Sequence, residues 1–219
     1  MPNHIVLLGD SIFDNKPYTG GKPDVVTHLR ELLPSPWQAT LCAVDGATTD
    51  HLAPQLGKIP SGASHLVVSI GGNDALGDLD MLTQPVSSTT EALWVFADRA
   101  HRFESSYRAA LREVQRLELP VTICTIYNGN LSMEEAEVAR IALMIFNDAI
   151  LRTAFENGFG LIDLRSVCSE PEDYANPIEP SGPGGRKIAE TIKRAIVTEQ
   201  GCDSRVFAGM TSPLSQAKT

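Results

Sequence analysis

The chain has 219 residues, enough for one α/β domain with a sizeable hydrophobic core. Its 18 Lys and Arg residues and 27 Asp and Glu residues give a formal net charge of −9, which argues against nucleic acid or an anionic membrane as the main partner. Hydrophobic residues make up 42% of the chain, too many for a disordered protein, and no apolar run approaches the roughly 20 residues of a membrane-spanning helix.

The first third of the chain alternates short apolar runs with a helical pattern. Residues 5–8 predict a strand that stops at a glycine. Asp24 is a favourable N-cap for the helix that follows, and prolines at 34 and 36 end that helix. Residues 37–44 predict a second strand and residues 66–70 a third, because both runs are mostly aliphatic or β-branched.

A long helix is predicted next. Ser88 and Glu91 have the spacing of a capping box. Apolar side chains then recur at steps of three and four residues, which indicates one buried helix face. The members of this face are Leu93, Phe96, Ala100, Phe103, Tyr107, Leu111, Val114 and Leu117. We interpret its aromatic residues as core rather than as a ligand cage.

The last part of the chain completes the pattern. Residues 121–126 predict a fourth strand, and Ser132 with Glu135 forms a second capping box that opens another helix. Residues 161–164 predict a fifth strand, and isoleucines between 188 and 196 mark a final helix. Five strands separated by helices predict βαβ units, a parallel sheet and helices on both faces. We expect one domain over residues 1–199 and a polar C-terminal tail over residues 200–219.

Cysteine usage and the N-terminus indicate the compartment. Cys42, Cys124, Cys168 and Cys202 show no zinc-ligand spacing and are interpreted as reduced structural thiols. The N-terminus lacks the basic lead of a signal peptide. The sequence therefore predicts a cytoplasmic protein.

Three loops that follow strands carry residues suited to acyl-transfer chemistry. The tripeptide Gly9-Asp10-Ser11 follows the first strand, residues 45–50 the second and residues 71–74 the third. In an open parallel sheet these loops lie on the same rim. A serine on a sharp turn can act as a nucleophile, a glycine lets a backbone N–H approach a ligand, and an asparagine amide can donate to an oxyanion.

The three loops resemble the blocks of a known family. The sequence is similar to the SGNH (GDSL-type) hydrolases, named for a serine, a glycine, an asparagine and a histidine in four separate blocks. The residues that match the first three blocks are Gly9-Asp10-Ser11, Gly46 and Gly71-Gly72-Asn73-Asp74. The resemblance spans residues 5–197 and implies a flavodoxin-like three-layer α/β/α sandwich with a five-stranded parallel sheet.

The resemblance also implies a role for each matched residue. Ser11 corresponds to the nucleophile. The backbone N–H groups of Ser11 and Gly46 and the side-chain amide of Asn73 correspond to the oxyanion hole. The family includes esterases, thioesterases, lipases and carbohydrate-ester deacetylases, so a small-molecule ester is the expected substrate.

The fourth block departs from the family pattern, Asp-x-x-His-Pro. The matching stretch here is Asn176-Pro177-Ile178-Glu179-Pro180, so Glu179 occupies the histidine position and Asn176 the aspartate position. A carboxylate can accept the serine proton, and burial or a second carboxylate would raise its pKa from about 4.3 toward a useful value. A protonated Glu is neutral, so a neutral Asn176 is a consistent orienting group.

The sequence therefore predicts a serine ester hydrolase in which Ser11 attacks, Glu179 is the general base and Asn176 orients Glu179. No cofactor and no metal are expected, because neither a metal-ligand cluster nor a dinucleotide fingerprint occurs. Two alternatives stay open. The chain could be catalytically inactive and bind an acyl ligand, a sugar ester or a protein partner, or it could transfer the acyl group to an acceptor other than water.

Four polar residues near the rim are candidate pocket residues. Asp10 is expected to hydrogen-bond backbone. Asp14 and Asn15 either shape the pocket or cap the next segment. Asp74 either tunes the base by like-charge repulsion or is a solvated cap. Among the histidines, only His51 lies on the predicted rim, as a surrogate base or a solvated side chain.

One segment after the third block is expected to select the substrate. Residues 76–88 follow the third block, and we expect them to overhang the rim and set specificity.

Overall fold

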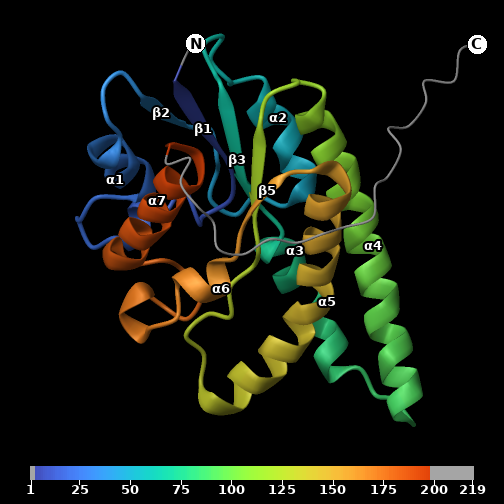
Figure 1. The fold of residues 1–219 in the computed structure, drawn as a ribbon. Coiled ribbons are helices and arrows are strands. Elements are labelled where there is room, and N and C mark those ends of the chain that lie inside the picture. The colour runs from blue at the N-terminus through green and yellow to red at the C-terminus, as the bar shows by residue number, and fades with distance from the viewer. Residues whose placement is uncertain (1–2, 198–219) are drawn as a thin grey trace, which may run out of the picture.

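The computed structural model describes residues 3–197 of the chain (Figure 1). Five strands form one sheet in the order β2-β1-β3-β4-β5, and every neighbouring pair is parallel. The strands are β1 (His4–Gly9), β2 (Gln38–Leu41), β3 (His65–Ser69), β4 (Val121–Cys124) and β5 (Gly160–Ile162). The predicted five-stranded parallel sheet is confirmed. The strand order reverses between β1 and β3, so a crevice opens at their carboxyl ends.

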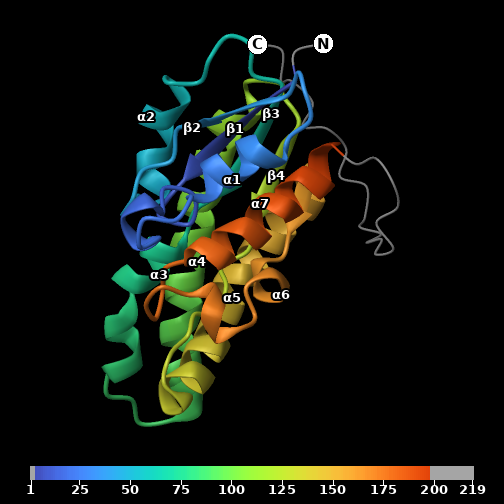
Figure 2. The same cartoon turned by 90° about the vertical axis from the view of Figure 1, so that its left-hand side faces the viewer.

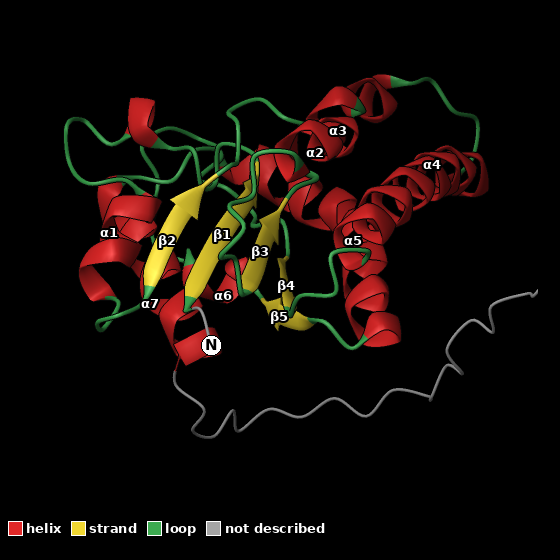
Figure 3. Cartoon of the chain, turned by 90° about the horizontal axis from the view of Figure 1, so that it is seen from above, coloured by secondary structure: helices red, strands yellow, loops and turns green. Residues whose placement is uncertain are grey.

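Helices cover both faces of the sheet (Figure 3). One layer contains α1 (Val25–Leu32), α6 (Leu164–Val167) and α7 (Gly182–Val197). The other contains α2 (Leu52–Leu56), α4 (Thr89–Gln115) and α5 (Met133–Asn157). Alternation along β1 supplies both cores, since Ile5 and Leu7 pack with α1 and α7 while Val6 and Leu8 pack with α4 and α5. The predicted three-layer α/β/α architecture is confirmed.

Helices α4 and α5 are longer than the sheet that they cover. Their N-terminal halves extend past the carboxyl edge of the sheet, toward α3 (Gly72–Gly77) and the 3₁₀ turn η3 (Leu79–Thr83) (Figures 1 and 2). The predicted buried face of the long helix is therefore only partly correct. Phe103 and Tyr107 are buried, whereas Leu93 is 65% exposed because no sheet lies beneath it.

The helix caps follow the sequence closely. Asp24 accepts from the first turn of α1, and Ser132 forms its predicted capping box at the start of α5. At α4, Ser88 accepts from the Glu91 N–H at 3.1 Å, but the Glu91 carboxylate accepts from Ser87 instead of returning to Ser88. The predicted capping box there is therefore only half formed.

Several boundaries differ from the sequence-based expectation. Strands β2, β4 and β5 are shorter than predicted, and Leu164 begins α6 because the Asp163 side chain accepts from the first turn of that helix. Cys42, Cys124 and Cys168 are free and buried, while Cys202 and the tail from residue 200 lie outside the described residues. Within residues 3–197, no helix has the length and hydrophobicity to cross a membrane.

Candidate active site

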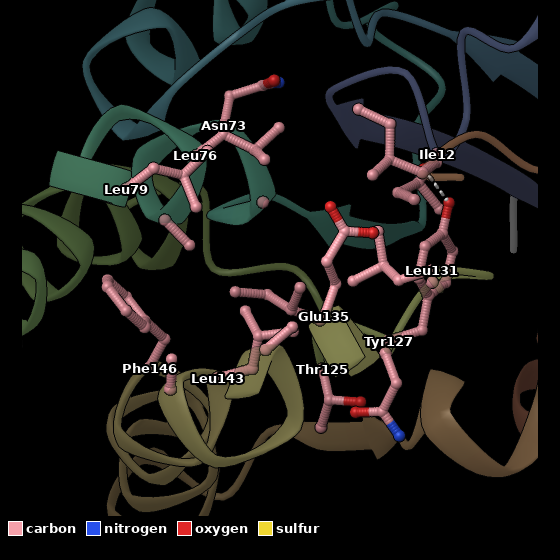
Figure 4. Close-up of a pocket in the computed structure, with 18 of the residues that line it drawn as sticks. Ile12, Asn73, Leu76, Leu79, Thr125, Tyr127, Leu131, Glu135, Leu143 and Phe146 are labelled. Atoms are coloured by element: carbon pink, nitrogen blue, oxygen red, sulfur yellow. Dashed lines mark hydrogen bonds between the residues drawn. The ribbon is translucent and has the colours of Figure 1, made fainter. Parts of the chain in front are cut away.

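A cavity of about 510 Å³ opens at the carboxyl edge of the sheet (Figure 4). Its walls come from the loop after β1, the end of β3, α3 with η3, the loop after β4, the N-terminal half of α5 and the loop before α7. Four of the predicted site residues line it together: Asp10, Ser11, Asn73 and Glu179. Residues from both ends of the chain therefore share one pocket.

Ser11 sits on a tight turn that the end of β1 makes. Gly9 has φ +131°, and a Cβ there would lie 1.7 Å from the Ser69 carbonyl oxygen, so only glycine fits. The Asp10 N–H donates to that same oxygen at 3.1 Å, and the Asp10 carboxylate accepts from the Ile12 N–H at 3.1 Å. Asp10 therefore forms hydrogen bonds with the backbone, as expected, and holds the turn that presents Ser11. The Ser11 residue is 7% exposed.

Glu179 belongs to the loop that precedes α7. The Asn176 side-chain oxygen accepts from the backbone N–H groups of Ile178 and Glu179, at 2.9 Å each. Asn176 therefore orients Glu179 through its backbone. From the sequence we expected the Asn176 amide to lie beside the Glu179 carboxylate. In the structure its oxygen bonds to backbone N–H groups of the loop instead, and Asn176 is exposed on the outer side of the loop.

Two further side chains hold this loop from inside the protein. The Tyr127 hydroxyl donates to the Ile178 carbonyl oxygen at 2.6 Å. The Asn15 amide donates to the Pro180 carbonyl oxygen at 3.1 Å, and its oxygen accepts from the Val25 N–H at 3.0 Å. Carbonyl groups on both sides of Glu179 are thus fixed. Asn15, which is fully buried and outside the cavity lining, caps α1 and braces the loop.

Ser11 and Glu179 both line the cavity and are both buried. Burial raises the pKa of Glu179 above its ordinary value of 4.5, a hydrogen bond from Ser11 lowers it, and the charge of Asp45 raises it again. Burial dominates, so the net shift is upward. Glu179 is 7% exposed, and its Oε2 is buried without a hydrogen-bond partner among the described residues. A free carboxylate oxygen beside a serine hydroxyl has the capacity to accept a proton.

Asp10 is a second buried carboxyl in the same site. Burial raises its pKa from 3.8 to about 8, and the charges of Glu179 and Asp74 push it in the same direction, against the bond from Ile12. With a pKa of about 8, Asp10 is mostly protonated at neutral pH.

Besides Ser11, the candidate oxyanion donors belong to the loop after β2 and to the start of α3. Asn73, in the first turn of α3, lines the cavity, and its amide donates to the Ala47 carbonyl oxygen at 2.9 Å. Gly46 has φ +76°, is exposed and lies outside the cavity lining, next to the residue that Asn73 binds. Within the described residues, the backbone N–H groups of Ser11 and Gly46 have no hydrogen-bond acceptor.

The remaining candidates support the loops without lining the cavity. Asp14 accepts from the Asp45 N–H at 3.0 Å and so holds the loop before Gly46. Asp74 accepts from the Thr49 hydroxyl at 2.7 Å, and its charge raises the pKa of Asp10. His51 is exposed, with its Nδ1 turned to the Thr48 N–H at 3.1 Å.

The comparisons with known proteins decide the family. The model of the GDSL-like lipase/acylhydrolase family matches residues 7–184. The chain belongs to this family. The resemblance predicted from the sequence blocks is thereby confirmed. No curated protein matches the chain in sequence.

Solved structures of the same fold carry titles that name several ester chemistries. A lipase from Streptomyces rimosus has a TM-score of 0.64 to this GDSL-like chain at 17% identity, covering 88% of this chain and 99% of that one. A phospholipase A1 from Streptomyces albidoflavus has a TM-score of 0.65 at 18% identity, and the match covers 88% of this chain and 100% of that one. An acetyl xylan esterase from Geobacillus stearothermophilus has a TM-score of 0.58 at 16% identity, and the match covers 91% of this chain and 97% of that one. At these identities the likeness concerns the fold.

Sequence reasoning missed two contributors to the site of this GDSL-like chain. Tyr127 immediately follows the predicted fourth strand, so the same strand-end argument that singled out Ser11 applied to it. Asp45 precedes Gly46, and its charge acts on Glu179. The α5 wall of the cavity had no sequence signal, because its apolar positions look the same as those of a helix face packed on a core.

Proposed function

We propose that the chain is a serine ester hydrolase that uses Ser11 as nucleophile and Glu179 as general base. One observation supports this proposal: Ser11 lines the same cavity as the buried carboxyl of Glu179, whose pKa is raised by burial and lowered by the Ser11 hydroxyl. A serine hydroxyl needs a neighbouring base to become a nucleophile. In the described residues lining the cavity, Glu179 is the group placed to take that proton, since no histidine lines it.

The proposed reaction has two halves. Ser11 Oγ attacks the ester carbonyl carbon while its proton passes to Glu179. The resulting oxyanion accepts from the N–H groups of Ser11 and Gly46 and from the Asn73 amide. The C–O bond to the alcohol then breaks, and protonated Glu179 gives its proton to the leaving oxygen. Water then attacks the acyl carbon and gives a proton to Glu179. The bond from the acyl carbon to Ser11 Oγ breaks, Glu179 returns the proton to Oγ, and the carboxylic acid leaves.

A raised pKa suits a carboxylate to this role. The efficiency of a general base increases as its pKa approaches the working pH. Glu179 acts as a base only when ionised, so the rate should fall as the pH drops through its pKa. Because burial raises that pKa above 4.5, the acid limb of the rate should lie at higher pH than an ordinary glutamate base would give.

The test combines active-site labelling with rates. A fluorophosphonate should label wild type, and Ser11→Ala should lose both labelling and ester hydrolysis. Glu179→Gln should fold and lose at least about a hundredfold in kcat/KM. Ser105→Ala and Glu137→Gln, at exposed helix positions, are the matched controls and should keep wild-type rates.

Four outcomes would contradict parts of this assignment. Hydrolysis that survives Ser11→Ala would remove the whole site. Wild-type turnover in Glu179→Gln would remove Glu179 from the mechanism. A folded wild-type protein that neither labels nor hydrolyses any ester would favour a binding protein. A rate that depends on an added alcohol acceptor would instead indicate acyl transfer.

A further inference from the structure

The cavity continues well beyond the reacting groups. Asn147 of α5 holds Ile126, two residues past the end of β4, through bonds of 2.8 and 2.9 Å. Position 147 therefore marks the level of the sheet edge. The α5 residues that line the cavity, from Glu134 to Phe146, all lie beyond this level. The reaction site is at the edge, and the rest of the cavity extends away from it.

The walls of this extension are apolar on both sides, and we call the extension the apolar arm. Its residues are Leu76, Leu79 and Leu82 from α3 and η3, and Val138, Ala139, Ala142 and Leu143 from α5. Figure 4 shows Leu76 and Leu79 opposite Leu143 and Phe146. Of the segment 76–88 that was expected to overhang the rim, residues 76–82 supply one wall of the arm, whereas residues 83–88 are not in the lining. Such a lining favours a hydrocarbon over a sugar, which needs hydrogen-bond partners along its length.

The charges near the arm also limit its ligand. In the described residues, no Lys, Arg or His lines the cavity. Its carboxyl groups are those of Asp10 and Glu179 at the reaction end and Glu134 and Glu135 at the far end. Anionic groups such as phosphates find no basic partner there, so the lining disfavours an anionic occupant.

The length of the arm matches a lipid-like chain. From Glu135 to Phe146 the helix rises about 17 Å, at about 1.5 Å per residue. One leaflet of a bilayer, half of its hydrocarbon core of roughly 30 Å, holds acyl chains in about 15 Å. The far end is open, since Leu79 is 52% and Val138 is 50% exposed.

The α5 wall is graded by side-chain size. Phe146, Ala142 and Ala139 are spaced by four and three residues, so they lie on one helix face in a row along the arm. The Phe146 ring packs edge-to-face against Phe103, with ring centroids 5.0 Å apart, and so is fixed at the reaction end. The two alanines leave room about 8 Å and about 12 Å from the level of position 147.

We infer that the apolar arm binds the acyl chain of a medium- or long-chain ester and that Ala142 and Ala139 determine how long that chain can be. The inference rests on the proposed function, because it places the ester carbonyl at Ser11. Each methylene buried in the arm should tighten binding about fourfold. The preferred substrate is therefore a neutral ester with an extended acyl chain, and an acetyl ester leaves the arm empty.

The test separates chain binding from catalysis. Methyl ketones of increasing chain length carry the carbonyl without a leaving group, and their affinity for wild type and for Ser11→Ala is measured by calorimetry. Affinity should rise about fourfold per methylene until the arm is full. In Ala142→Phe the affinity should stop rising at a shorter ketone chain than in wild type. In Ala139→Phe it should stop at a chain about 4.5 Å longer than in Ala142→Phe. Ala109→Phe, at an exposed position of α4, is the control.

The outcomes are distinguishable from those of the proposed function. If Ser11→Ala abolishes hydrolysis and the ketone series still shows two different cut-offs, both proposals stand. If no ester is hydrolysed but the cut-offs appear, the arm survives and the chemistry fails. A flat affinity series in wild type, or identical curves for both phenylalanine variants and the control, overturns the inference. Ala139→Phe, at a half-buried position near the open end, keeps the test valid if Ala142→Phe fails to fold.

Discussion

Replacing Asp10 by asparagine should stabilise the protein, and more so as the pH rises. Burial raises the pKa of Asp10 from 3.8 to about 8, so its carboxyl stays protonated in the folded protein where the unfolded chain ionises. The folded state is therefore penalised increasingly between those two pH values. An asparagine oxygen can still accept from the Ile12 N–H, which preserves the turn at Ser11.

The magnitude follows from the two pKa values. Each pH unit above 3.8 costs the folded protein about 1.4 kcal/mol, until the pH reaches about 8. At pH 5 the penalty is about 1.5 kcal/mol, and at pH 7 about 4 kcal/mol. Asp10→Asn removes it, so the free energy of unfolding should gain these amounts over wild type. Functional sites often contain groups that lower the stability of the folded protein because the activity requires them.

Urea unfolding followed by tryptophan fluorescence at several pH values measures this gain. The difference in unfolding free energy between Asp10→Asn and wild type should widen steadily from pH 4 to pH 8. Asp50→Asn, at an exposed position, should show no such widening. A difference for Asp10→Asn that is the same at every pH would refute the reasoning, because it would show that Asp10 is ionised in the folded protein.

Three further substitutions test the site and its support. Asp45→Asn should move the acid limb of kcat/KM to lower pH, because the charge of Asp45 raises the pKa of the proposed base; an unmoved limb would contradict this. Tyr127→Phe leaves the Ile178 carbonyl unpaired, and we expect a loss of about 1–3 kcal/mol in urea unfolding and a lower kcat with little change in KM. Gly9→Ala places a Cβ 1.7 Å from a β3 carbonyl and should cost more than about 4 kcal/mol, whereas Gly20→Ala, in open space, should cost about 1 kcal/mol by the same assay.

The sheet and its helices were predictable because each rests on local signals. Alternation along residues 5–8 sends side chains to both faces, and the caps at Asp24 and Ser132 mark helix starts that the structure contains. The exposure of Leu93 was not predictable in this way. Its spacing fits the apolar face of α4, but whether a sheet lies beneath that turn depends on where the helix starts relative to the sheet edge, which is a tertiary property.

The site was predictable to the level of loops. The strand-end argument brought Ser11 and Asn73 to one rim, and the register of the fourth block brought Glu179 there. The contacts within the rim could not be derived. Asn176 bonds backbone instead of the carboxylate, and Asn15 reaches across 165 positions to the Pro180 carbonyl. Such contacts depend on loop conformations that follow from packing and carry no sequence period.

A glutamate base suits this pocket for an electrostatic reason. An imidazole that takes the serine proton becomes a cation and needs a buried anion beside it. A carboxylate that takes the proton becomes neutral, so the transfer leaves no new charge pair to solvate. The pocket already contains a second carboxyl, Asp10, that is neutral at pH 7, and no basic side chain lines it within the described residues. In the proposed mechanism one negative charge would pass from Glu179 to the oxyanion and back, so the proton transfer would create no pair of opposite charges in this pocket.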